Sequence, residues 1–191
     1  MKQIAIGVTG ASGSIYAARL FEKLKQSSFD NANVAVVFSE KGEQVFRYEI
    51  GSEEFNIIPF KKYNNNDFLA PFASGSSLFD TFIVAPCSMG TLARIANGTA
   101  DNLICRAADV MLKERRQLIL ITRETPLNLI HLKNMEQITL SGGVICPASP
   151  SFYSKPATIE QVVDTVVDRV LKLAGIAIDT YRWGNSDDST T

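Results

Sequence analysis

Small and hydroxyl-bearing residues occur at two points where a strand pattern gives way to a helix pattern. Residues 85–91 (APCSMGT) follow the apolar run 81–84 and lead into a helical pattern at 92–96. Residues 7–13 (GVTGASG) form a second loop of this kind near the N-terminus. The first turn of a helix leaves backbone N–H groups without partners, and such groups bind anions, typically phosphate. The two loops therefore predict one phosphorylated ligand held from two sides.

The first loop does not have the pattern of a dinucleotide site. Gly7, Gly10 and Gly13 are spaced GxxGxxG, whereas dinucleotide-binding loops are typically GxGxxG, with an acidic residue after the second strand for the ribose hydroxyls. Ser39 stands at that place, with Glu40 only adjacent. A serine binds a ribityl hydroxyl or a phosphate oxygen equally well, so the sequence favours a mononucleotide such as FMN. A tight turn without a ligand stays open as the alternative for this loop.

Charged residues form a second set of candidates. Arg123 and Glu124 directly precede a predicted helix, although a solvated ion pair is the ordinary alternative. Arg106 and Lys113 are seven residues apart on one predicted helix and therefore share a face, which by itself is more often a solvated face. The sequence alone does not decide between these alternatives.

Two more candidates lie near the C-terminal end. Arg169 is on the polar side of the last predicted helix, beside Asp168, and the solvated alternative applies to it as well. Tyr153 lies in a loop rich in proline and serine, where tyrosine more often packs than reacts. Periodicity and spacing therefore predict an α/β protein that binds a phosphorylated mononucleotide and give no more specific function.

Alternating strand and helix patterns must position these residues. Apolar runs predict strands at residues 4–8, 34–38, 81–85, 117–122 and 143–146. Helical patterns predict helices at residues 14–25, 42–50, 92–96, 100–116, 126–138 and 158–174. The last but one of these helices is expected to take Thr125 as its N-cap and Pro126 as its first residue. Residues 51–80 are less regular, with loop signals at 64–66 and 74–77.

This alternation predicts a three-layer, doubly wound, mostly parallel α/β sheet of the Rossmann-like or flavodoxin-like kind. One α/β domain, which would bind the mononucleotide, is expected over residues 1–183, followed by a polar tail at 184–191 that we expect to be disordered. Ligands of such sheets bind beyond the carboxyl ends of the strands. Both loops, Ser39 and the Arg123–Glu124 pair follow strands, so we expect them to meet at one edge.

Composition excludes several classes of function. The chain has 191 residues, 46% of them hydrophobic, and a formal net charge of −1, which argues against a nucleic-acid binder. No apolar run reaches the length that a membrane span needs. Three widely spaced cysteines and a single histidine give no metal-ligand pattern, so no metal is expected. We expect a cytoplasmic protein with buried, reduced thiols.

Several longer motifs, in order, carry a resemblance to a known family. The chain resembles the UbiX-type flavin prenyltransferases over nearly all of residues 2–183. The matching motifs are GVTGASG (7–13), APCSMGTLARIA (85–96), RAAD (106–109) with LKERR (112–116), RETP (123–126), IHLKNM (130–135), PASP (147–150) with FY (152–153), and RWG (182–184). Such ordered matches are far more specific than a glycine loop.

The resemblance implies an unusual reaction. Enzymes of this family bind FMN and dimethylallyl monophosphate and join the dimethylallyl group to N5 and C6 of reduced flavin, which adds a fourth ring. The prenylated FMN then serves as the cofactor of UbiD-type decarboxylases. The resemblance also implies that no metal is needed, and that the chain forms a homo-oligomer, commonly a dodecamer, with sites between subunits.

The resemblance assigns roles to particular residues. It places FMN against small and polar residues: Gly10, Ala11, Ser12, Ser39, Ser88, Met89, Gly90, Thr91 and Arg123. It assigns the prenyl phosphate to Tyr153 and Arg169, with Arg106 and Lys113 from the same or a neighbouring subunit. Glu124 matches the proposed proton-transfer acid, and Glu49 an acidic group near the site, so Glu124, Glu49 and Lys113 are the catalytic candidates.

Three other functions compete with prenyl transfer. The first is an FMN-dependent decarboxylase of cysteine-type substrates, which needs a catalytic histidine. His131, the single histidine, lies inside a predicted helix and does not suit that role. The second is a non-catalytic FMN carrier, which would not need Glu124, Lys113, Arg169 and Tyr153 together. The third is direct decarboxylation of aromatic acids.

Overall fold

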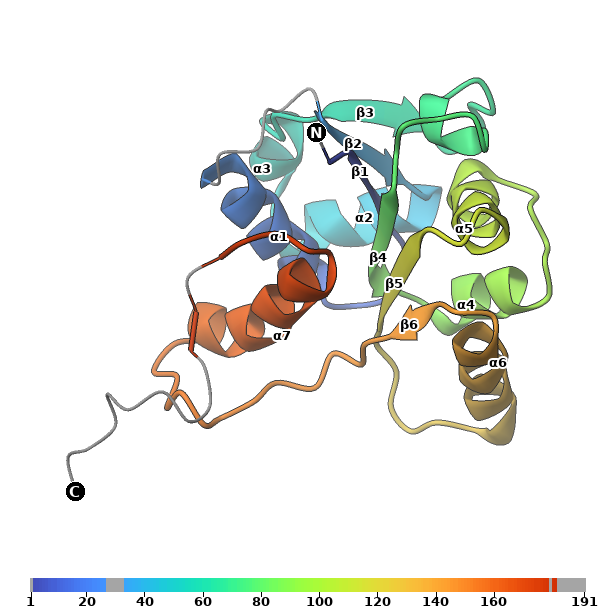
Figure 1. Ribbon diagram of the computed structural model, residues 1–191. Coiled ribbons are helices and arrows are strands. Elements are labelled where there is room, and N and C mark those ends of the chain that lie inside the picture. Colours follow the sequence, from blue (N-terminus) through green and yellow to red (C-terminus); the bar gives the residue numbers. More distant parts are fainter. Residues whose placement is uncertain (1, 27–32, 179, 182–191) are drawn as a thin grey trace.

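The computed structural model describes residues 2–26, 33–178 and 180–181 and shows one parallel sheet covered by helices on both faces (Figure 1). The predicted tail at 184–191 and the RWG motif at 182–184 lie outside the described residues, so the proposed domain boundary stays a prediction. The elements follow one another as β1 (Ile4–Val8), α1 (Ser14–Gln26), β2 (Val34–Phe38), α2 (Glu40–Glu49), α3 (Ser52–Asn56), β3 (Lys61–Asn64), the 3₁₀ turn η2 (Pro71–Ala73), β4 (Thr81–Cys87), α4 (Met89–Ala96), α5 (Leu103–Lys113), β5 (Gln117–Thr122), α6 (Leu129–Leu140), β6 (Val144–Ile145) and α7 (Ile159–Leu173).

The sheet has the strand order β3-β2-β1-β4-β5-β6, and all of its pairings are parallel. This is the order of the Rossmann fold, so the predicted doubly wound α/β class is confirmed, and the sheet is wholly parallel. The chain reverses its winding direction between β1 and β4. Connections that leave these two neighbours go to opposite faces, which opens a crevice at their carboxyl ends.

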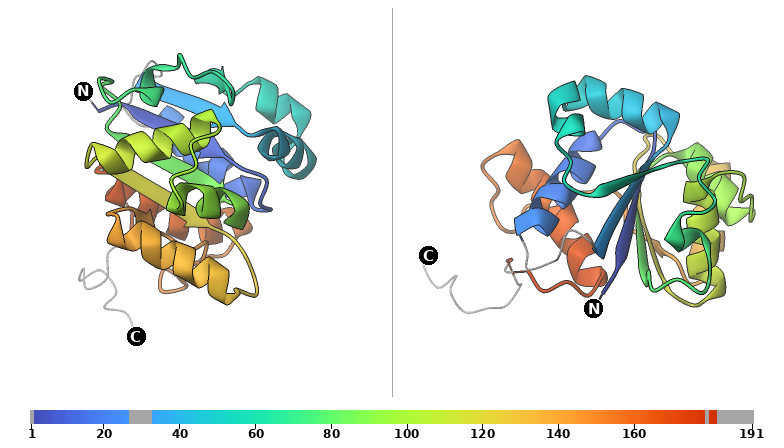
Figure 2. Two further views of the ribbon diagram at one scale, coloured as in Figure 1. Left: turned by 90° about the vertical axis from the view of Figure 1, so that its right-hand side faces the viewer. Right: turned by 90° about the horizontal axis from the view of Figure 1, so that it is seen from above.

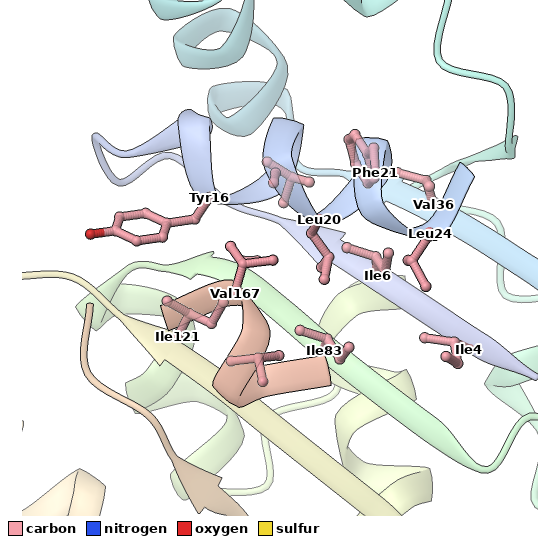
Figure 3. Packing of buried hydrophobic residues seen from close by; sticks show 14 of the residues in the cluster. Ile4, Ile6, Tyr16, Leu20, Phe21, Leu24, Val36, Ile83, Ile121 and Val167 are labelled. Atoms are coloured by element: carbon pink, nitrogen blue, oxygen red, sulfur yellow. The ribbon is translucent and has the colours of Figure 1, made fainter. Parts of the chain in front are cut away.

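Two apolar clusters hold the helices on the sheet. Alternate residues of each central strand point to opposite faces: Ile4 and Ile6 pack under α1 and α7, whereas Ala5 and Phe82 pack under α4 and α5. The right-hand view in Figure 2 shows α1 and α7 on one side of the sheet and α4 and α5 on the other. Figure 3 shows α1 presenting Leu20 toward the strands in the first cluster. Both faces of the central strands are therefore buried away from solvent, as their continuous apolar sequences predict.

The structure corrects three of the sequence predictions. The irregular region 51–80 contains the short helix α3 and the edge strand β3, whose polar sequence KKYN gives no strand signal because it is paired on one side only and largely exposed. The helix predicted at 100–116 spans only Leu103–Lys113. Asn102 starts it late by accepting a hydrogen bond from the Cys105 N–H, and Arg115 has a left-handed φ of 57° after its end.

The predicted helix start at Thr125–Pro126 is also wrong, because α6 begins at Leu129. Asn128 is the N-cap: its side chain accepts from the His131 N–H at 2.9 Å, and the His131 Nδ1 accepts from the Asn128 N–H at 3.4 Å. This reciprocal pair satisfies two N–H groups at once. The Thr125 N–H, in contrast, donates to the Glu124 carboxylate at 3.0 Å, and Pro126 follows a cis peptide bond.

A charged ladder joins α1 to α7. Arg19 donates to both oxygens of Asp164, at 2.8 and 2.6 Å, and Lys23 contacts Asp164 at 3.2 Å and Asp168 at 2.7 Å. Burial raises the pKa of the Asp164 carboxyl, but hydrogen bonds from Arg19 and Lys23 lower it by more, so it lies below the ordinary value of 3.8. The ladder therefore stabilises the packing of α1 on α7 while Asp164 is ionised.

The substitution Asp164→Asn tests this ladder. A carboxyl with a lowered folded pKa stabilises the protein above its unfolded pKa and loses that contribution as the pH falls through the folded pKa. We expect Asp164→Asn to reduce the free energy of unfolding by about 1 kcal/mol at pH 7, since solvent screens a partly exposed pair. The difference from the unsubstituted chain should shrink at pH values below 3.8.

Urea unfolding followed by circular dichroism at several pH values measures this effect. The control is Glu53→Gln, an exposed carboxyl of α3, for which we expect a change within about 0.5 kcal/mol. A difference for Asp164→Asn that persists undiminished in acid would show that the ladder's charge is not what stabilises the helix pair.

Candidate functional site

Thr9 joins the two glycine- and serine-rich loops at the β1/β4 crevice. Its hydroxyl donates to the Pro86 carbonyl at 2.7 Å and accepts from the Ser88 N–H at 2.8 Å. The residue is 1% exposed, so water does not compete for these bonds. In the sequence, Thr9 is marked only by its position as a hydroxyl directly after a buried strand. The bridge fixes the start of α4 relative to the loop after β1.

A polar cavity of about 380 Å³ opens beside this bridge. It is lined by four of the predicted cofactor residues, which come from the ends of three different strands: Gly10, Ser39, Ser88 and Thr91. Their convergence on one edge of the sheet confirms the expectation from strand order. The structure adds lining residues that the sequence analysis missed: Glu40, Lys41, Asn65, Arg94, Asn102 and Ile104. Lys41 and Arg94 give this cavity two cations; Arg94 lies within the 85–96 motif, but the sequence assigned it no role.

The N-terminus of α4 is the part of this cavity best suited to an anion. Ser88 is the N-cap: its hydroxyl accepts from the Thr91 N–H at 3.3 Å and donates to the Thr91 hydroxyl at 3.1 Å. The first turn of α4 contains no acidic residue, whereas α2, which Ser39 caps, has Glu40 and Glu43 in its first turn. A negative ligand group is therefore stabilised at α4 by the helix dipole. Because Met89 is buried among core residues, only its backbone remains for a ligand.

The loop of Ala11 and Ser12 leads into α1, and a carboxylate already occupies that helix start. Glu49 accepts hydrogen bonds from the Gly13 N–H at 2.9 Å and the Ser14 N–H at 2.7 Å. Burial raises the pKa of Glu49, but hydrogen bonds from the Ser12 hydroxyl and from the Ser14 and Gly13 N–H groups lower it by more. The structure therefore brings Glu49 to the glycine loop as an ionised group.

Arg123 and Glu124 line a neighbouring cavity of about 350 Å³ beyond β5, together with Thr122. Arg123 lies near the glycine loop, since an added Cβ at Gly13 would be 3.9 Å from its Cγ. Glu124 accepts from the Thr125 N–H at 3.0 Å and remains exposed. Both residues are thus at the same edge as the first cavity, as predicted.

Arg169 and Tyr153 lie apart from those two cavities. Arg169 lines a third cavity, of about 760 Å³, together with Ser151, Lys155 and Lys172. Tyr153 belongs to the same loop as Ser151 and is 69% exposed, so the core packing that the sequence left open for it is excluded. These two residues present a phenol and a guanidinium to the surface of the chain.

Lys113 and Arg106 are held elsewhere by α5. Lys113 ends the helix just before β5 begins, and a Cβ added at Gly75 would be 2.7 Å from its Nζ. Arg106 donates to the Ala73 carbonyl at 3.0 Å and pairs with Asp109 at 2.8 Å. β5 has six residues, so its two ends are about 20 Å apart. One chain therefore does not place Lys113 beside Glu124.

The described residues contain no cluster of three or more side chains of the metal-ligating kinds His, Cys, Asp and Glu that could hold a metal ion. Within the same ranges, no helix is long and apolar enough to cross a membrane.

A sheet in Rossmann order, with a hydroxyl-lined cavity at its switch point and a helix N-terminus free of acidic residues, defines the class of nucleotide-binding α/β proteins. Comparisons with known proteins narrow this class. The sequence profile of the Flavoprotein family matches residues 1–171. A curated relative, the flavin prenyltransferase UbiX of Methanocaldococcus jannaschii, is 43% identical over 185 residues, which are 95% of this chain and 98% of the relative.

Solved structures of UbiX-type proteins are also similar to this chain. AnUbiX (PadA1) in complex with FMN and dimethylallyl pyrophosphate superposes with a TM-score of 0.89 at 40% identity, covering 96% of this chain and 98% of that one. A dodecameric FMN-dependent UbiX-like decarboxylase from Escherichia coli O157:H7 gives 0.88 at 36% identity, covering 96% and 100%. The chain belongs to the Flavoprotein family and, within it, to the UbiX flavin prenyltransferases.

Gly42 is the residue that allows α2 to begin this close to β1. An added Cβ there would lie 2.2 Å from the Val8 carbonyl oxygen and 3.1 Å from the Ser39 hydroxyl. We expect Gly42→Ala to destabilise the protein by about 1–3 kcal/mol, since backbone must move to admit the methyl group. Gly90→Ala is the matched control, because its Cβ would meet only Arg94 at 3.6 Å. Equal free energies of unfolding for the two variants would contradict this close approach.

Proposed function

We propose that this protein is a flavin prenyltransferase that joins the dimethylallyl group of dimethylallyl monophosphate to N5 and C6 of reduced FMN. The prenylated FMN would then serve a UbiD-type decarboxylase as its cofactor. The observation that carries the proposal is the convergence of Gly10, Ser39, Ser88 and Thr91 on one cavity in a chain that belongs to this family. Reduced flavin would supply the nucleophilic N5 and C6 atoms.

The chain's own residues fit FMN. The cavity holds hydroxyls for ribityl and phosphate oxygens, and α4 directs N–H groups toward it. Arg94 and Lys41 supply positive charge, and Arg123 lies at the same edge near Gly13. The cofactor roles of Gly10, Ala11, Ser12, Ser39, Ser88, Met89, Gly90, Thr91 and Arg123 are part of this proposal.

The prenyl donor needs cations because its phosphate leaves with negative charge. We assign Arg106, Lys113 and Arg169 to this phosphate, since fixed Arg and Lys side chains stabilise charge as it develops. Arg side chains can hold two phosphate oxygens at once. Tyr153 would present its ring and hydroxyl to the same substrate, and an aromatic face stabilises an allylic cation. Enough fixed cations around the phosphate would make a metal ion unnecessary.

Glu124 is the group we assign to proton transfer at C6. Its carboxylate is held at the cavity edge by the Thr125 N–H and is exposed to an incoming substrate. Ring closure must release a proton, and a positioned carboxylate can take it, with the leaving phosphate as a second acceptor. Glu49 faces the glycine loop and is the second acidic group of the site.

Assembly between subunits would complete the site. Lys113 lies at the amino end of β5 and Glu124 follows its carboxyl end, so they can meet only if different chains contribute them. α6 has a single fully buried residue, Ile138, and exposes several large apolar side chains: Leu129, Ile130, Leu132 and Leu140. Such a face is typical of an oligomer contact. We therefore propose a homo-oligomer, with a dodecamer as the expected form.

The competing functions are less well supported. The cysteine-type decarboxylase needs a reactive histidine, but His131 is used in the capping box of α6. An FMN carrier would not need Glu124, Lys113, Arg169 and Tyr153 together. Direct decarboxylation of aromatic acids stays open as an activity, and the following assay separates it from prenyl transfer.

Anaerobic incubation of the full chain with reduced FMN and dimethylallyl monophosphate tests the proposal. Mass spectrometry of the released flavin should show a five-carbon adduct. Glu124→Gln should still bind FMN and should form the adduct about 10²–10⁴-fold more slowly, as expected for loss of one general acid–base group. Bound FMN without any adduct from the unsubstituted chain would refute prenyl transfer, and an unchanged rate in Glu124→Gln would refute the proton-transfer role.

Co-expression of Lys113→Ala and Glu124→Gln chains with different tags tests the shared site. If each site combines Lys113 of one subunit with Glu124 of another, random assembly leaves about one quarter of the sites intact. Doubly tagged assemblies should therefore recover about that fraction of activity. Lys113→Ala co-expressed with a second tagged copy of itself is the control. Mixed assemblies no more active than the single variants would contradict a site shared in this way.

A further inference from the structure

The helices α1 and α4, which begin on either side of the crevice, differ in whether their first N–H groups can bind a ligand phosphate. α1 and α4 both begin at the carboxyl ends of their strands, on either side of the point where the winding reverses. The N-terminus of α4 opens into the 380 Å³ cavity. The N-terminus of α1 is filled by a side chain of the protein itself.

Glu49 fills the start of α1 through its carboxylate. Its Oε2 accepts from the Gly13 N–H at 2.9 Å and from the Ser14 N–H at 2.7 Å, while Oε1 is 3.3 Å from the Gly13 nitrogen. Gly13 has a φ of +110°, a backbone conformation that residues with a side chain rarely adopt. In this turn the N–H groups of Gly13 and Ser14 both point to the Glu49 carboxylate. The same two N–H groups are those an external phosphate would use.

The charge of Glu49 makes this arrangement selective. Burial raises the pKa of the carboxyl, and hydrogen bonds from Ser12, Ser14 and Gly13 lower it by more, so the group is ionised at neutral pH. A phosphate at α1 would have to displace the carboxylate from its donors and then lie beside the displaced negative charge. At α4 no carboxylate occupies the first N–H groups, because its first turn contains no acidic residue, and Glu40 of the same cavity is accompanied by Lys41 and Arg94.

Proteins with this strand order bind the pyrophosphate of a dinucleotide at the first helix. We propose that Glu49 restricts the flavin site to mononucleotides by filling the N-terminus of α1, where the second phosphate of a dinucleotide would otherwise bind. The single phosphate of the ligand is then directed to α4. This inference rests on the proposed flavin site and names the residue that determines which flavin the site accepts.

The test compares the affinities of FMN and FAD, which differ by an adenylate group with a second phosphate. Fluorescence titration of the full chain gives both dissociation constants for the unsubstituted protein, Glu49→Gln and Glu49→Ala. Glu49→Ala should lower the preference for FMN over FAD by about tenfold or more, as expected from freeing a helix N-terminus and removing a like charge. Glu49→Gln, which keeps one acceptor oxygen and loses the charge, should lower it less.

Glu53→Gln in α3 is the matched control and should leave the preference unchanged, because this exposed carboxyl is not at a nucleotide-facing helix start. An unchanged preference in a Glu49→Ala protein that still binds FMN would overturn the inference. Loss of both flavins in Glu49→Ala, with an unchanged melting temperature, would also overturn it, because the carboxylate would then support FMN itself. Failure of the unsubstituted chain to bind FMN would instead overturn the proposed function.

Discussion

The site depends on two hydrogen bonds of the buried Thr9 hydroxyl, which join the loop after β1 to the loop after β4. β1 and β4 are neighbours in the sheet, but the connections that follow them go to opposite faces, so their loops need a link to hold one ligand. Thr9 provides it by donating to Pro86 and accepting from the Ser88 N–H, at 2.7 and 2.8 Å. The bridge sets the start of α4 against the glycine loop, and the hydroxyls of Ser39, Ser88 and Thr91 then line one cavity. The proposed phosphate site therefore depends on two loops that the Thr9 hydroxyl holds in a fixed relative position.

Of the two helices that begin on either side of this crevice, α4 favours a negatively charged ligand at its N-terminus and α1 disfavours one. Ser88 caps α4, and the first turn of α4 contains no acidic residue, whereas Glu49 places a carboxylate at the start of α1. A fold whose strand order is typical of dinucleotide binding is thereby adapted to one phosphate. The second phosphate of the reaction, on the prenyl donor, is assigned to cations that one chain holds far apart, Lys113 on α5 and Arg169 on α7. The proposed chemistry therefore depends on assembly as much as on the fold.

Much of this arrangement could be predicted from the sequence, because continuous apolar runs mark buried parallel strands and because strand order brings their carboxyl ends together. Gly10, Ser39 and Ser88 were found in this way and do share a cavity. Edge strand β3 was missed since its KKYN sequence has no apolar pattern, and the start of α6 was misplaced because Asn128 caps it with His131. Thr9 was missed because its role comes from contacts with a distant loop, and Lys41 and Arg94 because only the folded sheet brings them to one cavity. The separation of Lys113 from Glu124 is likewise a consequence of topology that no local motif records.

A crystal structure of the full chain with FMN tests the central claim, that the ligand phosphate is held at α4 while Glu49 keeps α1 closed. We predict phosphate oxygens within hydrogen-bond distance of the backbone N–H groups at the start of α4 and near Ser39, with Glu49 still bound to the Gly13 and Ser14 N–H groups. A phosphate seated on those two N–H groups, with the Glu49 carboxylate displaced, would contradict the account.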